Sequence, residues 1–114
     1  MNFGTRLRQL RLGKFNQRDL ADKVGIDFTY LSKIENGKMP PPSEEVIIKL
    51  AHELGADADE LLQLAKKVPE DIKTVIHKSP GMPAFLRSIS DLDDTEIRKL
   101  EEYARRIKAN REEE

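Results

Sequence analysis

The side chains best suited to recognition chemistry in this 114-residue chain gather in the segment from Asp27 to Lys38. If this segment is helical, Leu31 and Ile34 share its inward face. The outward face then carries aromatic, hydroxyl and cationic groups: Phe28, Thr29, Tyr30, Ser32 and Lys33. Such groups can contact thymine methyls, hydrogen-bond to base edges and pair with phosphates. The pattern predicts a surface that contacts nucleic acid.

The sequence lacks the residue patterns that are typical of enzyme active sites. It has no cysteine, which excludes disulfides and thiolate metal sites and fits a reducing compartment. The two histidines, His52 and His77, lie in separate helical segments without partners at metal-ligand spacing. The carboxylate pairs at 44–45 and 93–94 fall at predicted helix starts, where the helix dipole accounts for them. We therefore expect no enzyme, no metal and no cofactor.

Five short helices are predicted to hold this surface, all within residues 1–67. Polar caps begin them and glycines end most of them, and their apolar residues recur with helical spacing. No stretch alternates as a strand would, so the expected fold is all-α. Asp57 with Glu60, and Asp93 with Glu96 further on, have the spacing of a capping box. The five predicted segments run from Asn2 to Leu12, Asn16 to Gly25, Asp27 to Asn36, Ser43 to Gly55 and Asp57 to Leu64.

The stretch from Asn16 to Gly37 combines two short helices with a glycine turn between them. Gly25 can adopt the left-handed conformation of such a turn, and Ala21 is small where the helices would cross. With these elements and the run from Tyr30 to Glu35, the sequence resembles the lambda-repressor-like, or Xre-type, helix-turn-helix family over residues 3–67. The resemblance implies a five-helix DNA-binding domain.

That resemblance also implies roles for single residues. The helix 28–35 would lie in the major groove of double-stranded DNA. An Arg11–Glu35 pair would be buried between the first and third helices and would fix their packing. We expect base-edge contacts from Phe28, Thr29, Ser32 and Lys33, and contacts to the DNA backbone from Asn16, Gln17, Arg18, Tyr30, Asn36 and Lys38.

Several of these residues have a structural alternative. Phe28 could cover the core near the turn, and Tyr30 could belong to the core edge with only its hydroxyl reaching a phosphate. Thr29 and Ser32 could simply be tolerated on an exposed helix. These alternatives stay open at the level of sequence.

Charge is unevenly distributed along the chain, although the net charge is only −1. Residues 1–42 contain eight Lys and Arg against four Asp and Glu, whereas residues 43–67 contain three against six and residues 68–114 nine against eleven. Positive charge is therefore concentrated in the part that would face phosphates. A mixed solvated surface would give a similar count, so charge alone does not decide the function.

Residues 68–114 are predicted to form a helical C-terminal dimerisation segment. They contain too few apolar residues for an independent monomeric core, and they would gain most by packing on a second copy. The last helix shows a short heptad pattern. An alternative is that the segment packs back on residues 43–67. The expected dimer interface consists of Phe85, Leu86, Ile89, Leu92, Ile97, Leu100, Ala104 and Ile107.

Two linked modules can read two half-sites one helical turn apart. We expect a cytoplasmic homodimer that binds an inverted-repeat operator as a transcriptional repressor, controlling a small stress or phage-defence operon. Alternatives are an antitoxin or restriction–modification controller of the same fold, and a protein-interaction adaptor without DNA binding. Some similar regulators are released when a partner zinc metallopeptidase cuts a helical tail, and Ala84–Ser88 is a candidate segment for such a cut. No apolar run approaches the ~20 residues that span a membrane.

Overall fold

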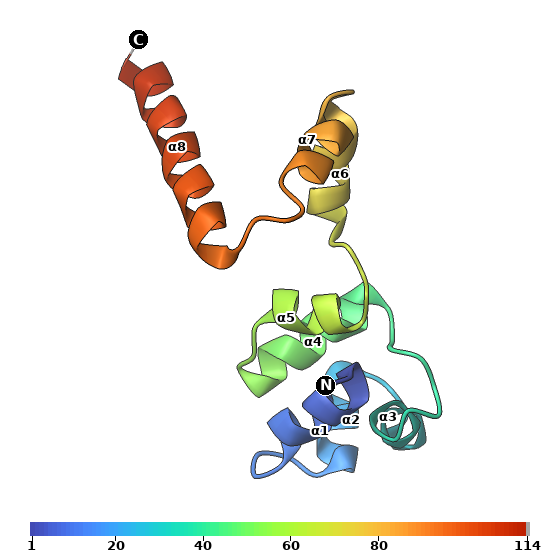
Figure 1. The fold of residues 1–114 in the computed structure, drawn as a ribbon. Helices are drawn as coiled ribbons and strands as arrows, with labels where there is room; N and C mark the ends of the chain where they lie inside the picture. The colour runs from blue at the N-terminus through green and yellow to red at the C-terminus, as the bar shows by residue number, and fades with distance from the viewer. Residues whose placement is uncertain (114) are drawn as a thin grey trace. The chain divides into compact units, whose positions relative to one another are not determined.

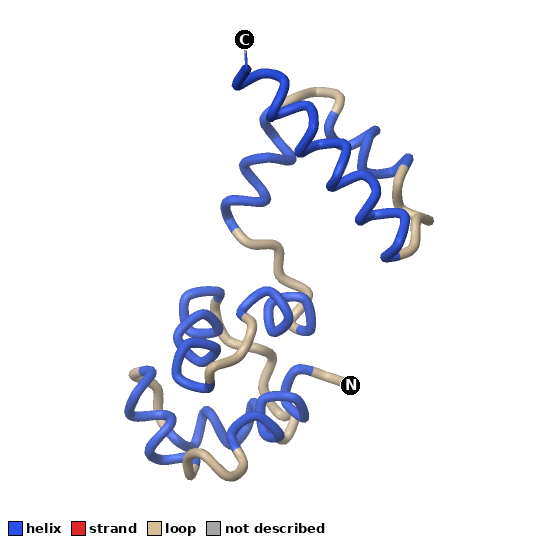
Figure 2. The backbone as a smooth tube through the Cα atoms, turned by 90° about the vertical axis from the view of Figure 1, so that its left-hand side faces the viewer, coloured by secondary structure: helices blue, strands red, loops and turns tan. Residues whose placement is uncertain are grey.

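The computed structural model describes residues 1–113, and the regular structure of that range is entirely helical (Figure 2). The predicted all-α fold class is confirmed. None of these helices is both long and apolar enough to cross a bilayer. The helices, in chain order, are α1 (Phe3–Arg11), α2 (Gln17–Val24), α3 (Phe28–Glu35), α4 (Glu44–Leu54), α5 (Ala58–Leu64), α6 (Glu70–Lys78), α7 (Met82–Ser88) and α8 (Asp94–Glu113) (Figure 1).

The chain divides into two compact units, residues 1–73 and residues 74–114. The first contains α1 to α5 and the beginning of α6, and the second contains the remainder of α6 with α7 and α8. The sequence prediction placed its boundary slightly earlier, at Lys67. Each unit is described separately below.

Polar caps set the N-termini of the first five helices. In each, a side-chain oxygen accepts a hydrogen bond from a backbone N–H of the first turn, which satisfies a donor that has no partner within the helix. This local chemistry explains why the helix starts follow the sequence so closely. The caps are Asn2, Asn16, Asp27, Ser43 and Asp57.

Only one of the two expected capping boxes forms. Before α8, Asp93 and Glu96 bond reciprocally, with N···O distances of 3.1 and 2.8 Å. At α5, Asp57 caps the helix, but Glu60 Oε1 instead accepts from Arg6 Nε at 2.6 Å. The prediction of a box at Asp57 is therefore wrong in its second half, because a charged partner from α1 engages the Glu60 carboxylate.

The core of the first unit lies between its five helices. Packing is closest between α2 and α3, α2 and α4, α4 and α5, and α1 and α3. These contacts bury one apolar stripe from each helix, as expected for amphipathic helices. The buried apolar residues are Phe3, Leu7, Leu20, Ala21, Val24, Leu31, Ile34, Ile47, Leu50, Ala51, Leu54, Leu61 and Leu62.

Gly4 marks the close approach of α1 to the end of α3. A Cβ atom built at this position would overlap the carbonyl oxygen of Ile34 and lie 2.8 Å from that of Glu35. Both atoms belong to the backbone, so they cannot rotate away. Residue 4 must therefore be glycine for α1 and α3 to pack at this distance.

No residue after Leu62 is buried within the described chain. In the described part of the second unit, α6, α7 and α8 make no extensive contacts with one another. The side chains of Phe85 and Ile107 are about half exposed, at 49% and 50%. The candidate cleavage segment Ala84–Ser88 lies within α7, so a peptidase would have to unwind that helix to reach it.

Candidate nucleic-acid interface

The candidate interface is built from α2, the turn after it and α3. Gly25 ends α2 with a φ of 76°, a left-handed conformation that glycine adopts without strain. Ala21 is fully buried in the core of the first unit. Asp27 then caps α3, which lies at the edge of the first unit (Figure 1). The arrangement leaves the N-terminal end of α2 and the outer face of α3 in solvent.

A buried ion pair ties α1 to the end of α3. Arg11 Nε donates to Glu35 Oε2 at 2.7 Å, and Arg11 Nη2 donates to Glu35 Oε1 at 2.9 Å. The Glu35 side chain is fully buried and that of Arg11 is nearly so. The pKa of Arg11 is raised, chiefly by its hydrogen bond to Glu35, although burial opposes the shift. Arg11 therefore remains cationic, and the bidentate geometry fixes the position of α3 relative to α1.

Gln17 extends this pair towards the surface. Its Nε2 donates to Glu35 Oε1 at 3.2 Å, so the first side chain of α2 is oriented by the carboxylate at the end of α3. An amide nitrogen carries two hydrogens, and one of them remains for an outside acceptor. The sequence predicted Gln17 and the Arg11–Glu35 pair as separate features, whereas the structure joins them into one network.

Arg18 and Phe28 meet on the exposed side of the two helices. The Arg18 guanidinium lies 4.2 Å from the centroid of the Phe28 ring, which is cation–π geometry. Phe28 is 37% exposed and is not a member of the core. The sequence placed both residues near DNA but did not predict this contact. The two lie ten positions apart on different helices, so no local spacing reveals them.

The other predicted contact residues differ in their surroundings. Asn16 and Thr29 take part in capping: Asn16 Oδ1 accepts from Asp19 N at 2.7 Å, and Thr29 N donates to Asp27 Oδ1 at 3.1 Å. Tyr30 is half-buried and packs on the core, which is the geometry of its structural alternative. Ser32 is half-buried, and Lys33, Asn36 and Lys38 are exposed, as are Asn16 and Thr29.

Two further cations of the first unit are held by groups that lie far away in the sequence. Lys14 Nζ donates to Leu54 O at 2.5 Å and thereby caps the C-terminal end of α4. Arg6 pairs with Glu60. By contrast, Lys33 and Lys38 have no acidic partner among the described residues, and they remain available to an outside anion.

Comparison with known proteins identifies this arrangement. A family model described as "Helix-turn-helix domain" matches residues 4–67, which is more than half of the chain. The chain belongs to the helix-turn-helix family. This match confirms the family predicted from the segment between Asn16 and Gly37, and it supports a DNA-binding regulator.

One curated relative is also similar to this helix-turn-helix protein. It is named the uncharacterized HTH-type transcriptional regulator RghRB of Bacillus subtilis (strain 168), and it is 39% identical over 75 residues. The matched region covers 62% of this chain and 54% of the relative, so the chain spans about half of that protein's length. No solved structure gives a significant match.

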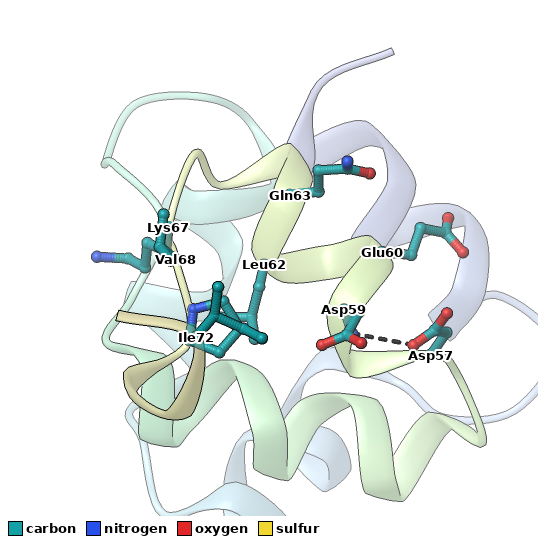
Figure 3. Close-up of a pocket in the computed structure, with 9 residues that line it drawn as sticks. Asp57, Asp59, Glu60, Leu62, Gln63, Lys67, Val68 and Ile72 are labelled. Atoms are coloured by element: carbon teal, nitrogen blue, oxygen red, sulfur yellow. Dashed lines mark hydrogen bonds between the residues drawn. The ribbon is translucent and has the colours of Figure 1, made fainter. Parts of the chain in front are cut away.

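A separate hollow of about 500 Å³ lies beside α5 of the helix-turn-helix unit (Figure 3). Its rim carries three carboxylates, and neither α2 nor α3 contributes to it. Negative charge would repel phosphates, so this hollow does not belong to the DNA-facing surface. The residues that line it are Asp57, Asp59, Glu60, Leu62, Gln63, Lys67, Val68, Pro69 and Ile72.

Proposed function

We propose that this helix-turn-helix protein is a homodimeric, sequence-specific repressor that places α3 in the major groove of an inverted-repeat operator. The observation that carries the proposal is the exposed α3 face, where Lys33 has no acidic partner in the described part of the chain, beside a rigidly held α2 N-terminus. A helix presented in this way can enter the groove, and cations without protein partners gain most from phosphates.

The proposed roles follow from the side chains and their positions. Thr29, Ser32 and Lys33 project from α3 and contact base edges. Gln17, held by Glu35, directs its remaining amide hydrogen to a phosphate, and Lys38 follows α3 and pairs with another. Tyr30 contributes mainly to the core edge, and only its hydroxyl reaches the DNA backbone.

Dimerisation supplies the affinity that one small module lacks. The apolar side chains of α6, α7 and α8 are exposed or half-buried in the single chain, and burying them against a second copy would stabilise both copies. The interface includes Phe85, Leu86, Ile89 and Leu92, together with the α8 stripe Ile97, Leu100, Ala104 and Ile107. Two linked domains then bind half-sites about one helical turn apart.

The experiment is selection of binding sites from a random duplex pool with the full chain, followed by affinity measurements over a range of salt concentrations. We expect an inverted repeat to be enriched and the affinity to fall steeply with salt. Lys33→Ala is expected to lower affinity for the selected site by about 10- to 100-fold. Lys49→Ala is the matched control, because Lys49 lies on α4, away from α3, and pairs with Glu45 of its own helix. If the chain enriches no duplex at low salt, the proposed DNA-binding function is wrong. The chain would then be a protein-interaction adaptor.

The Arg18–Phe28 contact leads to a prediction about coupling. Phe28→Leu keeps an apolar side chain but removes the ring that orients Arg18, so it should weaken DNA binding nearly as much as Arg18→Ala. The double variant should be only slightly weaker than either single one, because the two residues act as a unit. Affinities of the four proteins for the selected site complete this cycle. Losses that simply add would show that the contact has no role in binding.

The same variants distinguish two roles for Arg18. If Arg18 contacts a phosphate, Arg18→Ala should bind all sequences more weakly and enrich an unchanged motif. If Arg18 donates to a guanine edge, the selected motif should lose its preference at one position. Repeating the selection with Arg18→Ala gives the answer directly.

A further inference from the structure

The apolar stripe of α8 has an internal symmetry. Ile97 and Ile107 each lie five positions from residue 102, and Leu100 and Ala104 each lie two positions from it. Ile97 and Leu100 are half-buried, while Ala104 and Ile107 are exposed. In the described part of the second unit, no helix packs extensively on α8. Within that unit the stripe therefore lacks a partner that would cover its whole length.

We propose that α8 pairs with α8 of a second copy in antiparallel orientation, with residue 102 at the centre of the pair. This inference rests on the homodimer of the proposed function and adds its geometry. Reversing a helix about residue 102 brings Ile97 level with Ile107 of the second copy, and Leu100 level with Ala104 of the second copy. The four apolar residues then form four complete layers.

Packing favours this orientation over the parallel one. In the antiparallel pair each Leu100 faces an Ala104, so a large side chain lies against a small one and the layers have similar volumes. A parallel pair in register would place the two Ala104 side chains opposite each other. That layer would be underfilled between two layers of larger side chains, and such a gap is destabilising.

The charges beside the stripe favour the same orientation. In the heptad frame set by Ile97 and Leu100, Asp94, Glu101 and Lys108 share one flank, at the e positions. Antiparallel helices bring these flanks together, so Lys108 of one copy lies level with Asp94 of the other at both ends of the pair, offset by only about 3 Å along the axis. The two Glu101 side chains face each other near the centre, so the pair has two attractive contacts against one repulsive contact. A parallel pair would instead bring Glu101 near Glu96 of the second copy, where like charges repel.

Charge reversal separates the two orientations by the sign of the effect. For the antiparallel pair, K108E places two carboxylates together and should weaken the dimer by about fivefold, and D94K should do the same by placing two lysines together. The double variant D94K/K108E restores an opposite pair and should recover most of the affinity. For a parallel pair, residues 94 and 108 have no charged neighbour on the second copy, whereas E101K would attract Glu96 and strengthen the dimer. Sedimentation equilibrium of the 114-residue chain and of each variant measures the dissociation constants of the dimers.

Two further readouts make this test decisive. Glu101 also pairs with Arg105 of its own helix at 3.6 Å, and Asp94 lies in the first turn of α8, so circular dichroism must show that each variant retains its helix content. Because the chain has no cysteine, Asn110→Cys allows a spin label at one site per copy. The two labels should lie about 24 Å apart along the axis of an antiparallel pair, from the 1.5 Å rise per residue. A parallel pair would hold them about 10 Å apart.

Each outcome bears on a different claim. A monomeric wild-type chain would overturn both the proposed dimer and its α8 geometry. A dimer that is strengthened by E101K, or that is insensitive to both single reversals, would overturn the antiparallel α8 pair and leave the dimer standing. Weakening by each single reversal, recovery in the double variant and the longer label distance together establish the antiparallel pair.

Discussion

Arg11→Ala is expected to lower the free energy of unfolding by about 3–5 kcal/mol. The substitution leaves the Glu35 carboxylate without its cation, and the Glu35 side chain is fully buried. It also removes the bond from Arg11 Nη1 to Phe15 O, which at 3.2 Å ties the end of α1 to the loop before α2. An uncompensated charge in a low-dielectric interior accounts for most of the loss. Urea denaturation followed by circular dichroism measures it.

A matched control separates burial from simple loss of an ion pair. Arg6 and Glu60 form a comparably short pair of 2.6 Å, but their side chains are 32% and 41% exposed. Arg6→Ala should therefore cost no more than about 1 kcal/mol, as is usual for solvent-screened pairs. Equal losses for Arg6→Ala and Arg11→Ala would contradict the structural role of the buried pair. Arg11→Met combined with Glu35→Met should recover much of the lost stability, because it removes both charges.

Gly4→Ala is the second substitution with a large expected effect on stability. The sign of the change in the free energy of unfolding shows how closely α1 approaches α3. Within a helix, replacing glycine by alanine normally stabilises by about 1 kcal/mol. At residue 4 the added methyl group would overlap the carbonyl oxygens of Ile34 and Glu35. We therefore expect the free energy of unfolding to fall by about 2–3 kcal/mol instead. The same shift would disturb the Arg11–Glu35 geometry, because Glu35 belongs to the displaced turn.

Gly81→Ala is the control for this prediction. Gly81 precedes α7 with a φ of −84°, and a Cβ there would lie 3.9 Å from its nearest neighbour, Ser79 Oγ. Gly81→Ala should change the free energy of unfolding by no more than about 0.5 kcal/mol. Thermal unfolding of both variants beside the wild-type chain tests the pair. A stabilised Gly4→Ala would mean that α1 and α3 do not approach as closely as the structure places them.

The sequence predicts the helices well, because their starts and ends depend on nearby residues. Asn16 and Asp27 cap the helices that follow them, and Gly25 allows the turn between. Contacts between helices are harder to predict from the sequence, because they depend on which faces of the helices meet. Glu60 has the spacing of a capping box and yet pairs with Arg6 from α1. No pattern within α5 could reveal that competitor.

The candidate site shows the same division between local and long-range information. Residue types on α3 are sufficient to predict an exposed face with hydroxyl and cationic groups. Sequence does not show that Gln17 bonds to Glu35, or that Arg18 lies over Phe28, because these pairs join different helices. For Tyr30 the sequence allowed either a contact to DNA or a place at the edge of the core. The burial of its side chain, which bears on this choice, depends on the packing of several helices. The chemistry of the surface is therefore predictable, but the orientation of its members is not.

The length of α8 has a consequence for how two DNA-binding domains would be spaced. In an antiparallel pair centred on residue 102, the two Asp94 residues begin their helices at opposite ends, about 24 Å apart along the axis. Successive major-groove sites on one face of B-DNA are about 34 Å apart. The attachment points would thus be separated by a distance of the same order as the helical repeat. Adding or removing one heptad in α8 would change this separation by about 10 Å, and with it the preferred gap between half-sites.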